Sequence, residues 1–183
     1  MVEKSVRHQS KGQAAMEYLM TYGWAILVIV IVIAALLFLN PFKAPETCLF
    51  QQPGFSCSEA KPQVFVGEDG ATKVSMRIYN KQGQVVKLKK VLCTNVASGD
   101  ITSDNADDFS AEPMSVPAGG SVLFSGDTAV TCKDESGNAL QLSANSEFKG
   151  IVALWYNFDN DPDQDIERTA TATLISTVLA TGQ

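Results

Sequence analysis

The sequence predicts an α+β protein in which one long hydrophobic N-terminal helix is followed by an all-β, antiparallel sandwich-like head. Two observations carry this prediction. No charged residue occurs between Tyr18 and Phe42, and Gly23–Leu39 is an almost unbroken apolar run. Residues 44–183, in contrast, alternate short strand-like runs with clusters of turn-forming residues. The chain therefore has two parts with different solvents: an apolar segment and a polar, acidic head.

The apolar segment predicts a membrane-spanning helix. At about 1.5 Å per residue, Tyr18–Leu39 extends for about 33 Å, which is enough to cross a hydrocarbon core of about 30 Å. The β-branched run 28–33 still forms a helix in lipid, because the backbone there must satisfy its own hydrogen bonds. Basic residues precede the span at positions 4, 7 and 11, whereas Lys43 alone follows it closely. We therefore expect a cytoplasmic N-terminus and an external head.

Glu17 is a carboxylate at the start of this otherwise apolar helix. One interpretation places it among lipid headgroups at the membrane edge. The other gives it a cationic partner from a neighbouring chain, because an ionisable group within a membrane segment usually has a function. The residue alone does not decide between them.

The junction between the basic leader and the apolar run has the sequence KGQAAMEY over residues 11–18. This segment resembles the class III signal peptide of archaeal type IV pilin-like proteins, the adhesion pilin family. The resemblance implies that a prepilin peptidase cleaves between Gly12 and Gln13 on the cytoplasmic side. It also implies that Glu17 becomes the fifth residue of the mature chain, followed by Tyr18. It covers the leader and the helix, and it does not extend to residues 44–183.

The resemblance divides the chain into a leader (1–12), a transmembrane and filament-core helix (13–43) and an extracellular head (44–183). It implies a pilin that polymerises with itself through the helix into a surface pilus, with the head presenting a surface for adhesion. The new α-amino group of Gln13 would neutralise Glu17 of a neighbour and set the axial register. Its other partners would be the peptidase, the pilus assembly machinery and, before assembly, the cell membrane. The alternative is a membrane-anchored extracellular binding module, or a minor pilin outside the bulk filament.

Composition argues against two other classes of function. The formal net charge is −6, and an acidic surface repels nucleic acid. The one histidine, His8, belongs to the leader, so the mature chain would lack an imidazole for acid–base, nucleophilic or zinc chemistry. We expect neither an enzyme nor a cofactor.

The four cysteines, Cys48, Cys57, Cys93 and Cys132, all follow the span, on the side expected to be oxidising. Pro53-Gly54 lies in the middle of the first loop and favours a turn that brings its ends together. Of the three possible connectivities we favour 48–57 with 93–132. A metal held by four thiolates is the alternative, but the CxxC spacing of such sites is absent from the sequence.

The head has seven candidate strands, which argue for an antiparallel sandwich. Alternation places Val74, Met76 and Ile78 on one face, and it places residues 86, 88 and 92 together on another. Gly150–Phe158 is apolar enough to be buried on both faces, and the last strand has a solvated threonine face. The candidate strands are 62–68, 72–80, 84–94, 121–125, 129–132, 149–158 and 166–179.

An acidic segment between the last two strands places Asp159, Asp161, Asp163 and Asp165 at alternate positions. Oxygen ligands on a turn suit Ca²⁺, although Gln164 and Ala170 depart from the EF-hand pattern. A solvated hairpin tip is the favoured alternative. A second acidic cluster, 100–108, has the same two interpretations.

Overall fold

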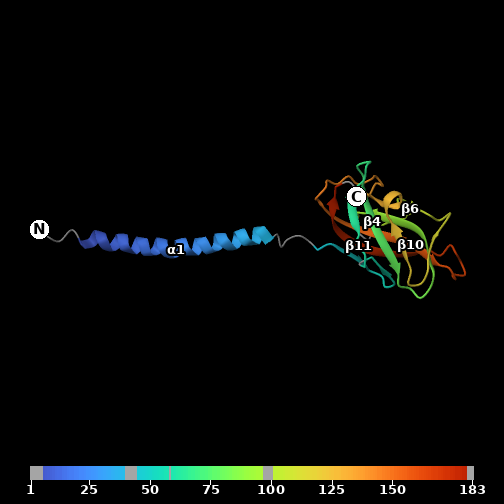
Figure 1. Ribbon diagram of the computed structural model, residues 1–183, viewed down its shortest axis with the longest axis horizontal. Helices are drawn as coiled ribbons and strands as arrows, with labels where there is room; N and C mark the ends of the chain where they lie inside the picture. The colour runs from blue at the N-terminus through green and yellow to red at the C-terminus, as the bar shows by residue number, and fades with distance from the viewer. Residues whose placement is uncertain (1–5, 40–44, 58, 97–100, 181–183) are drawn as a thin grey trace. The chain divides into compact units, whose positions relative to one another are not determined.

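The computed structural model describes residues 6–39, 45–57, 59–96 and 101–180 (Figure 1). The chain divides into two compact units, Met1–Ala44 and Pro45–Gln183. The first unit contains a single helix and the second contains all the described strands. The predicted α+β organisation is confirmed at this level.

Helix α1 spans Val6–Leu39 and continues without a break through the Gly12–Gln13 junction. The observed helix therefore begins seven residues before the predicted one, 13–43. Residues 40–43 of the prediction lie outside the described part. Within α1, Ala15–Leu39 is long and apolar enough to cross a membrane, by length and composition. Such a segment can serve as an anchor or as a signal sequence.

All seven expected strands occur in the head, and four short ones accompany them. The expected strands are β3 (Gln63–Val66), β4 (Thr72–Asn80), β5 (Val86–Thr94), β8 (Ser121–Phe124), β9 (Val130–Lys133), β10 (Glu147–Phe158) and β11 (Arg168–Leu179). The additional ones are β1 (Thr47–Phe50), β2 (Phe55–Ser56), β6 (Asp107–Asp108) and β7 (Met114–Val116). These four strands have two to four residues each, and none of them was expected from the sequence.

The predicted sandwich is wrong, because the core of the head is a six-stranded barrel. The order of pairing is β11–β10–β5–β9–β4–β3, and β3 then pairs with β11. A sandwich needs two separate sheets, whereas here β3 contacts both β4 and β11 and so joins the two ends of one sheet. Alternation in a sequence specifies which side chains share a face, but it does not specify which strands pair.

Two of the six joints in the barrel are parallel, which no hairpin pattern predicts. The β5–β9 joint pairs Cys93 with Cys132, and the β3–β11 joint pairs Val64 with Val178. Both joints are short, with two residue pairs each. The antiparallel β4–β9 joint is equally short.

A register shift in β5 corrects the predicted face of that strand. Trp155 of β10 pairs with Lys90, but the next residue, Tyr156, pairs with Leu88, so β5 has an extra residue here. The extra residue reverses the alternation. Val86 and Leu88 lie in the barrel core as expected, whereas Leu92 lies on the opposite face with Ala153 and Trp155.

The other predicted faces are confirmed. Val74, Met76 and Ile78 of β4 are all buried in the core. Strand β10 is buried on both faces from Ile151 to Asn157, because Ile101 and Ala106 cover its outer side. Strand β11 directs Ala170, Ala172 and Leu174 inward and leaves most of its threonines on the outer face.

Two disulfides connect the cysteines as predicted, Cys48 to Cys57 and Cys93 to Cys132. The second joins strands β5 and β9 across a parallel joint of the barrel. The first joins β1, which pairs with β11, to the residue after β2, which pairs with β4. Each disulfide therefore fixes a place where the sheet has few backbone hydrogen bonds.

We predict that the Cys93–Cys132 bond stabilises the head more than the Cys48–Cys57 bond. Chain entropy alone gives about 4 kcal/mol for a separation of 39 residues and about 3 kcal/mol for 9 residues. The double substitutions C93A/C132A and C48A/C57A are well matched, since all four sites are buried. Denaturant unfolding of the full chain in detergent measures the free energy of unfolding that each double variant loses. A larger loss from C48A/C57A than from C93A/C132A would contradict the prediction.

Candidate functional site

Helix α1 has an apolar surface on every side from Ala15 to Leu39. Each residue in this range is exposed within the chain, and Phe38 is 90% exposed. An ordinary surface helix buries one face against its own domain. This helix has no such buried face among its described residues.

Glu17 is the one charged side chain among the described side chains of the helix, residues 15–39. It has no ion-pair partner among the described residues. Nearby, the Thr21 hydroxyl donates to the Glu17 carbonyl at 2.9 Å, and the rings of Tyr18 and Tyr22 have centroids 4.1 Å apart. The Tyr18 ring thus packs along the helix, while the Glu17 carboxylate remains available to a group from outside the chain.

Gly12 and Gln13, the residues of the expected cleavage site, lie in the first turns of α1. Their side chains fall outside the described part of the structure. Their backbone is continuous with the apolar segment, so an α-amino group created at Gln13 would be about one helical turn from Glu17 along the same helix.

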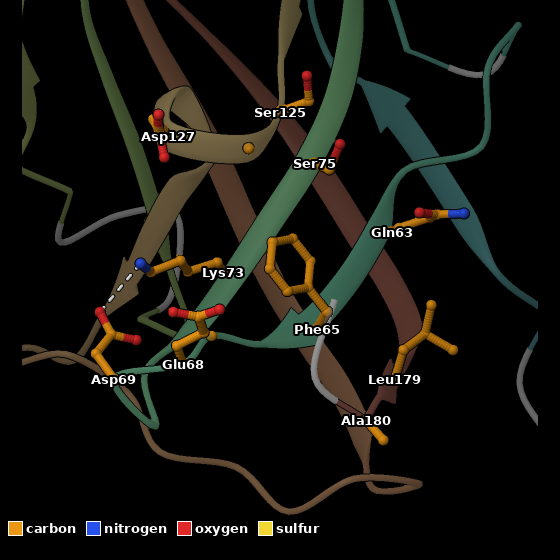
Figure 2. Close-up of a pocket in the computed structure, with 12 residues that line it drawn as sticks. Gln63, Phe65, Glu68, Asp69, Lys73, Ser75, Ser125, Asp127, Leu179 and Ala180 are labelled. Atoms are coloured by element: carbon orange, nitrogen blue, oxygen red, sulfur yellow. Dashed lines mark ion pairs between the residues drawn. The ribbon is translucent and has the colours of Figure 1, made fainter. Parts of the chain in front are cut away.

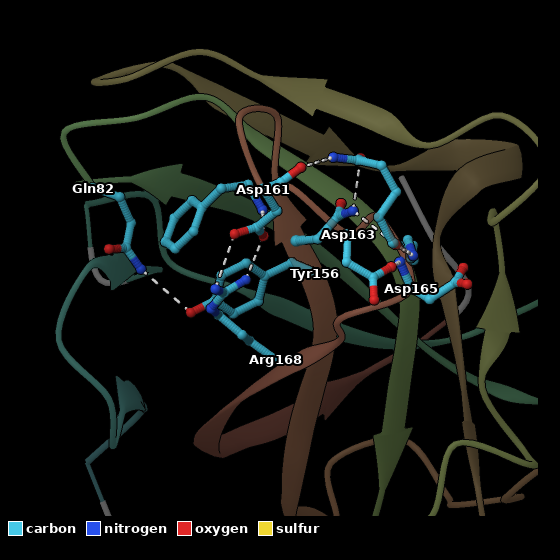
Figure 3. A network of polar contacts seen from close by, with 10 residues as sticks. Gln82, Tyr156, Asp161, Asp163, Asp165 and Arg168 are labelled. Carbon is cyan, nitrogen blue, oxygen red and sulfur yellow. Dashed lines mark hydrogen bonds and ion pairs between the residues drawn. The ribbon is translucent and has the colours of Figure 1, made fainter.

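The acidic hairpin 159–167 is held by basic residues of the barrel (Figure 3). The guanidinium of Arg168 makes two contacts with the Asp161 carboxylate, one of them 3.0 Å long, and lies 4.7 Å from the centre of the Phe158 ring. Asp161 also accepts the Phe158 N–H at 2.8 Å. These donors lower the pKa of Asp161, chiefly through Arg168, and Asp161 in turn raises the pKa of Arg168.

Lysines of β5 bind the remainder of this hairpin. Lys87 pairs with Asp159 at 2.7 Å, Lys90 lies 3.7 Å from Glu167, and Lys89 donates to the backbone carbonyl of Gln164. Lys89 is the extra residue of β5, and Lys87 and Lys90 lie on either side of it. The register shift that places Leu92 on the outer face therefore lies at the same place as the lysines that contact the hairpin. Three lysines of β5 therefore contact the acidic hairpin.

The hydrogen bonds within this segment are those of a hairpin tip. Asp163 accepts the N–H of Asp165, as a turn residue does, and Asp165 is exposed. Among the described residues no three His, Cys, Asp or Glu side chains are close enough to hold a metal ion. In the second acidic cluster, Asp107 pairs with Lys133 at 2.8 Å and Asp108 accepts the Ser110 N–H.

A groove of about 940 Å³ lies on the outside of the barrel (Figure 2). Phe65 and Leu179 form its apolar part. The polar part includes Asp69, which pairs with Lys73 at 3.0 Å, and this ammonium lowers the pKa of Asp69. Glu68 and Asp127 also line it, and neither has an ion pair within the described residues. Such a lining repels anions and can contact polar and apolar groups together.

Comparison with known proteins gives no match, either to a family model or to a curated protein. The function is therefore inferred from the residues and their geometry.

Sequence reasoning missed the cationic side of the acidic hairpin. Arg168 follows the last acidic residue directly, and this adjacency is a local signal that an internal ion pair was available. Of the three lysines, only Lys90 drew notice in the sequence, as an interruption of alternation. The partners of Lys87, Lys89 and Lys90 are more than 70 residues away. The groove also brings together residues from three distant segments, 63–75, 125–127 and 179–180.

We predict that Asp161→Asn destabilises the head at neutral pH but not in acid. The pKa of Asp161 is lowered on folding, so its stabilising effect is present above the ordinary pKa of roughly 3.9 and is lost as pH falls through the lowered value. The Asp161 side chain is 9% exposed and the Arg168 side chain is 35% exposed, so solvent screens the pair in part. Melting temperatures of wild type and variant should differ at pH 7 and converge at low pH. Asp165→Asn, on an exposed side chain, is the control; a constant difference for Asp161→Asn at every pH would contradict the assignment.

Proposed function

We propose that this protein is the structural subunit of an archaeal type IV-like surface pilus that polymerises through its N-terminal helix. One observation carries the proposal: α1 is apolar on all sides, is uncovered within the chain and has a single carboxylate near its start. A helix of this kind can lie in lipid before assembly and among sister helices afterwards. The same residues would then serve membrane insertion and polymerisation.

The apolar surface alone does not determine the geometry of such a filament. Lipid chains are as apolar as leucine, so helices gain little hydrophobic free energy on moving from lipid to one another. Packing and polar contacts must fix how far each helix slides along its neighbour. Glu17 is the polar group available in the described helix for that purpose, which supports its role in setting the register.

Cleavage after Gly12 would supply the partner of Glu17. The new α-amino group of Gln13 is a cation, and pairing with Glu17 of the adjacent subunit would neutralise both groups in a dry helix bundle. Desolvation offsets much of the attraction, so the pair would select one register more than it adds net stability. Loss of the leader, with three basic residues and one acidic residue, changes the formal charge from −6 to −8.

The head fits the external part of such a subunit. Its core and both disulfides lie entirely within the second unit, so the barrel does not need the helix to complete it. On a filament the heads would form the exposed surface and carry adhesion, while a prepilin peptidase and an assembly machinery would act on the helical part. A membrane-anchored binding module would use the same head without forming a filament.

We predict that Glu17→Gln reduces the number of filaments about tenfold or more, the effect of losing roughly 1.4 kcal/mol per subunit contact. The substitution keeps the shape of the side chain and removes its charge, so membrane insertion and leader removal should continue. Electron microscopy and shearing yields measure assembly, and immunoblots of membranes measure insertion.

Glu135→Gln is the matched control, because Glu135 is an exposed carboxylate in a head turn. This variant should form filaments as wild type does. Normal filament numbers from Glu17→Gln would contradict the register role. Absence of filaments from the wild-type chain, with the chain stable in the membrane, would instead favour the anchored binding module.

A further inference from the structure

A second groove, of about 510 Å³, lies where the head begins. We name it the base groove. Its apolar residues are Leu49, Pro62 and Ile175, with the Cys48–Cys57 disulfide at its wall. Glu46 and Lys61 line it as well and contribute opposite charges. Unlike the larger groove, it therefore has a mainly apolar lining with no net charge.

The register of β1 on β11 explains why this groove is apolar and open. Cys48 faces the barrel core, so Thr47 and Leu49 on either side of it face outward. Their partners on β11, Ile175 and Thr173, share that outer face. Leu49 is 70% exposed, while the other exposed large hydrophobic residues described in the head, Leu123, Ile166 and Leu179, are between 42% and 47% exposed.

The covalent chain sets an upper limit on the distance between the base groove and the end of the helix of the same chain. Glu46 in the groove follows Leu39, the last residue of α1, by seven positions. An extended chain spans at most about 3.6 Å per residue, which limits this distance to about 25 Å. Packed helices lie about 8–10 Å apart. In a bundle of these helices, the groove of one subunit is therefore within reach of its neighbours' helices.

We propose that the base groove binds the C-terminal part of helix α1 of a second copy of this chain. This inference rests on the proposed function. The occupant is the Leu36–Leu39 end of the helix, where Phe38 is 90% and Leu37 is 74% exposed. Both surfaces are apolar and exposed in the single chain, and contact would remove both from water. The heads would then be fixed to the helix bundle and not joined to it by a linker alone.

The direct test places a photo-crosslinking phenylalanine analogue at position 49 of the full chain, in filaments on cells. Illumination should give a dimer on a reducing, denaturing gel, and mass spectrometry should locate the bond in the helix peptide of the other copy, near Phe38. The matched control is the same analogue at Leu123, an exposed leucine on β8, which should give no helix crosslink.

Several outcomes would overturn the inference while filaments persist: no dimer, a bond to another head, or a bond only within one chain. Each would leave the pilin proposal standing. A wild-type chain that forms no filaments would remove the pilin proposal, and this inference with it.

We also predict that Leu49→Glu lowers the yield of intact filaments about tenfold or more, because a carboxylate replaces an apolar contact in every subunit. Leu123→Glu should leave the yield unchanged. A shift in gel mobility on reduction shows whether the disulfides, and hence the head, have formed in each variant. Normal filaments from Leu49→Glu with an intact head would contradict the contact.

Discussion

The structure depends on one unsatisfied surface, the apolar helix from Ala15 to Leu39, which nothing in its own domain covers. An exposed apolar surface of this size favours association in water. Under the proposed function, lipid covers it before assembly and other copies of the chain cover it afterwards. A charged residue in such a helix carries a desolvation cost. Glu17 lies at the N-terminal end of the segment, where a membrane interface lowers that cost before assembly and where a partner's amino group would offset it afterwards.

The head is stabilised independently of the helix. It folds around its own core, and the barrel has two short parallel joints and two added edge strands, β1 and β2. A disulfide lies at one parallel joint and another links the two added strands. Covalent bonds thus occur where ladder hydrogen bonds are few, and they limit the freedom of the unfolded chain. The ion pairs of the acidic hairpin have a similar local role, because they attach a charged loop to β5 and β11.

The sequence was sufficient for what local patterns determine. The length of the segment without charged residues predicted the helix. Strand-like runs between turn clusters predicted seven of the strands, and alternation predicted most of their faces. The Pro53-Gly54 turn supported the correct disulfide connectivity. The pairing of the strands could not be predicted from the sequence, because the contact of Val64 with Val178 that closes the barrel joins residues over 100 positions apart. The extra residue in β5 was hidden for the same reason: it is defined only by its partner strand. The grooves and the lysine partners of the hairpin follow from that pairing, so they could not be predicted either.

The central claim is that the helix is an assembly element of a processed subunit, and the N-terminus of the protein in its final location tests this most directly. Mass spectrometry of filaments sheared from cells should yield a terminal peptide that begins at Gln13 and carries a free or cyclised N-terminus. Chain found only in the membrane fraction and beginning at Met1 or Val2 would contradict the claim, because neither the new amino group nor the filament would then exist.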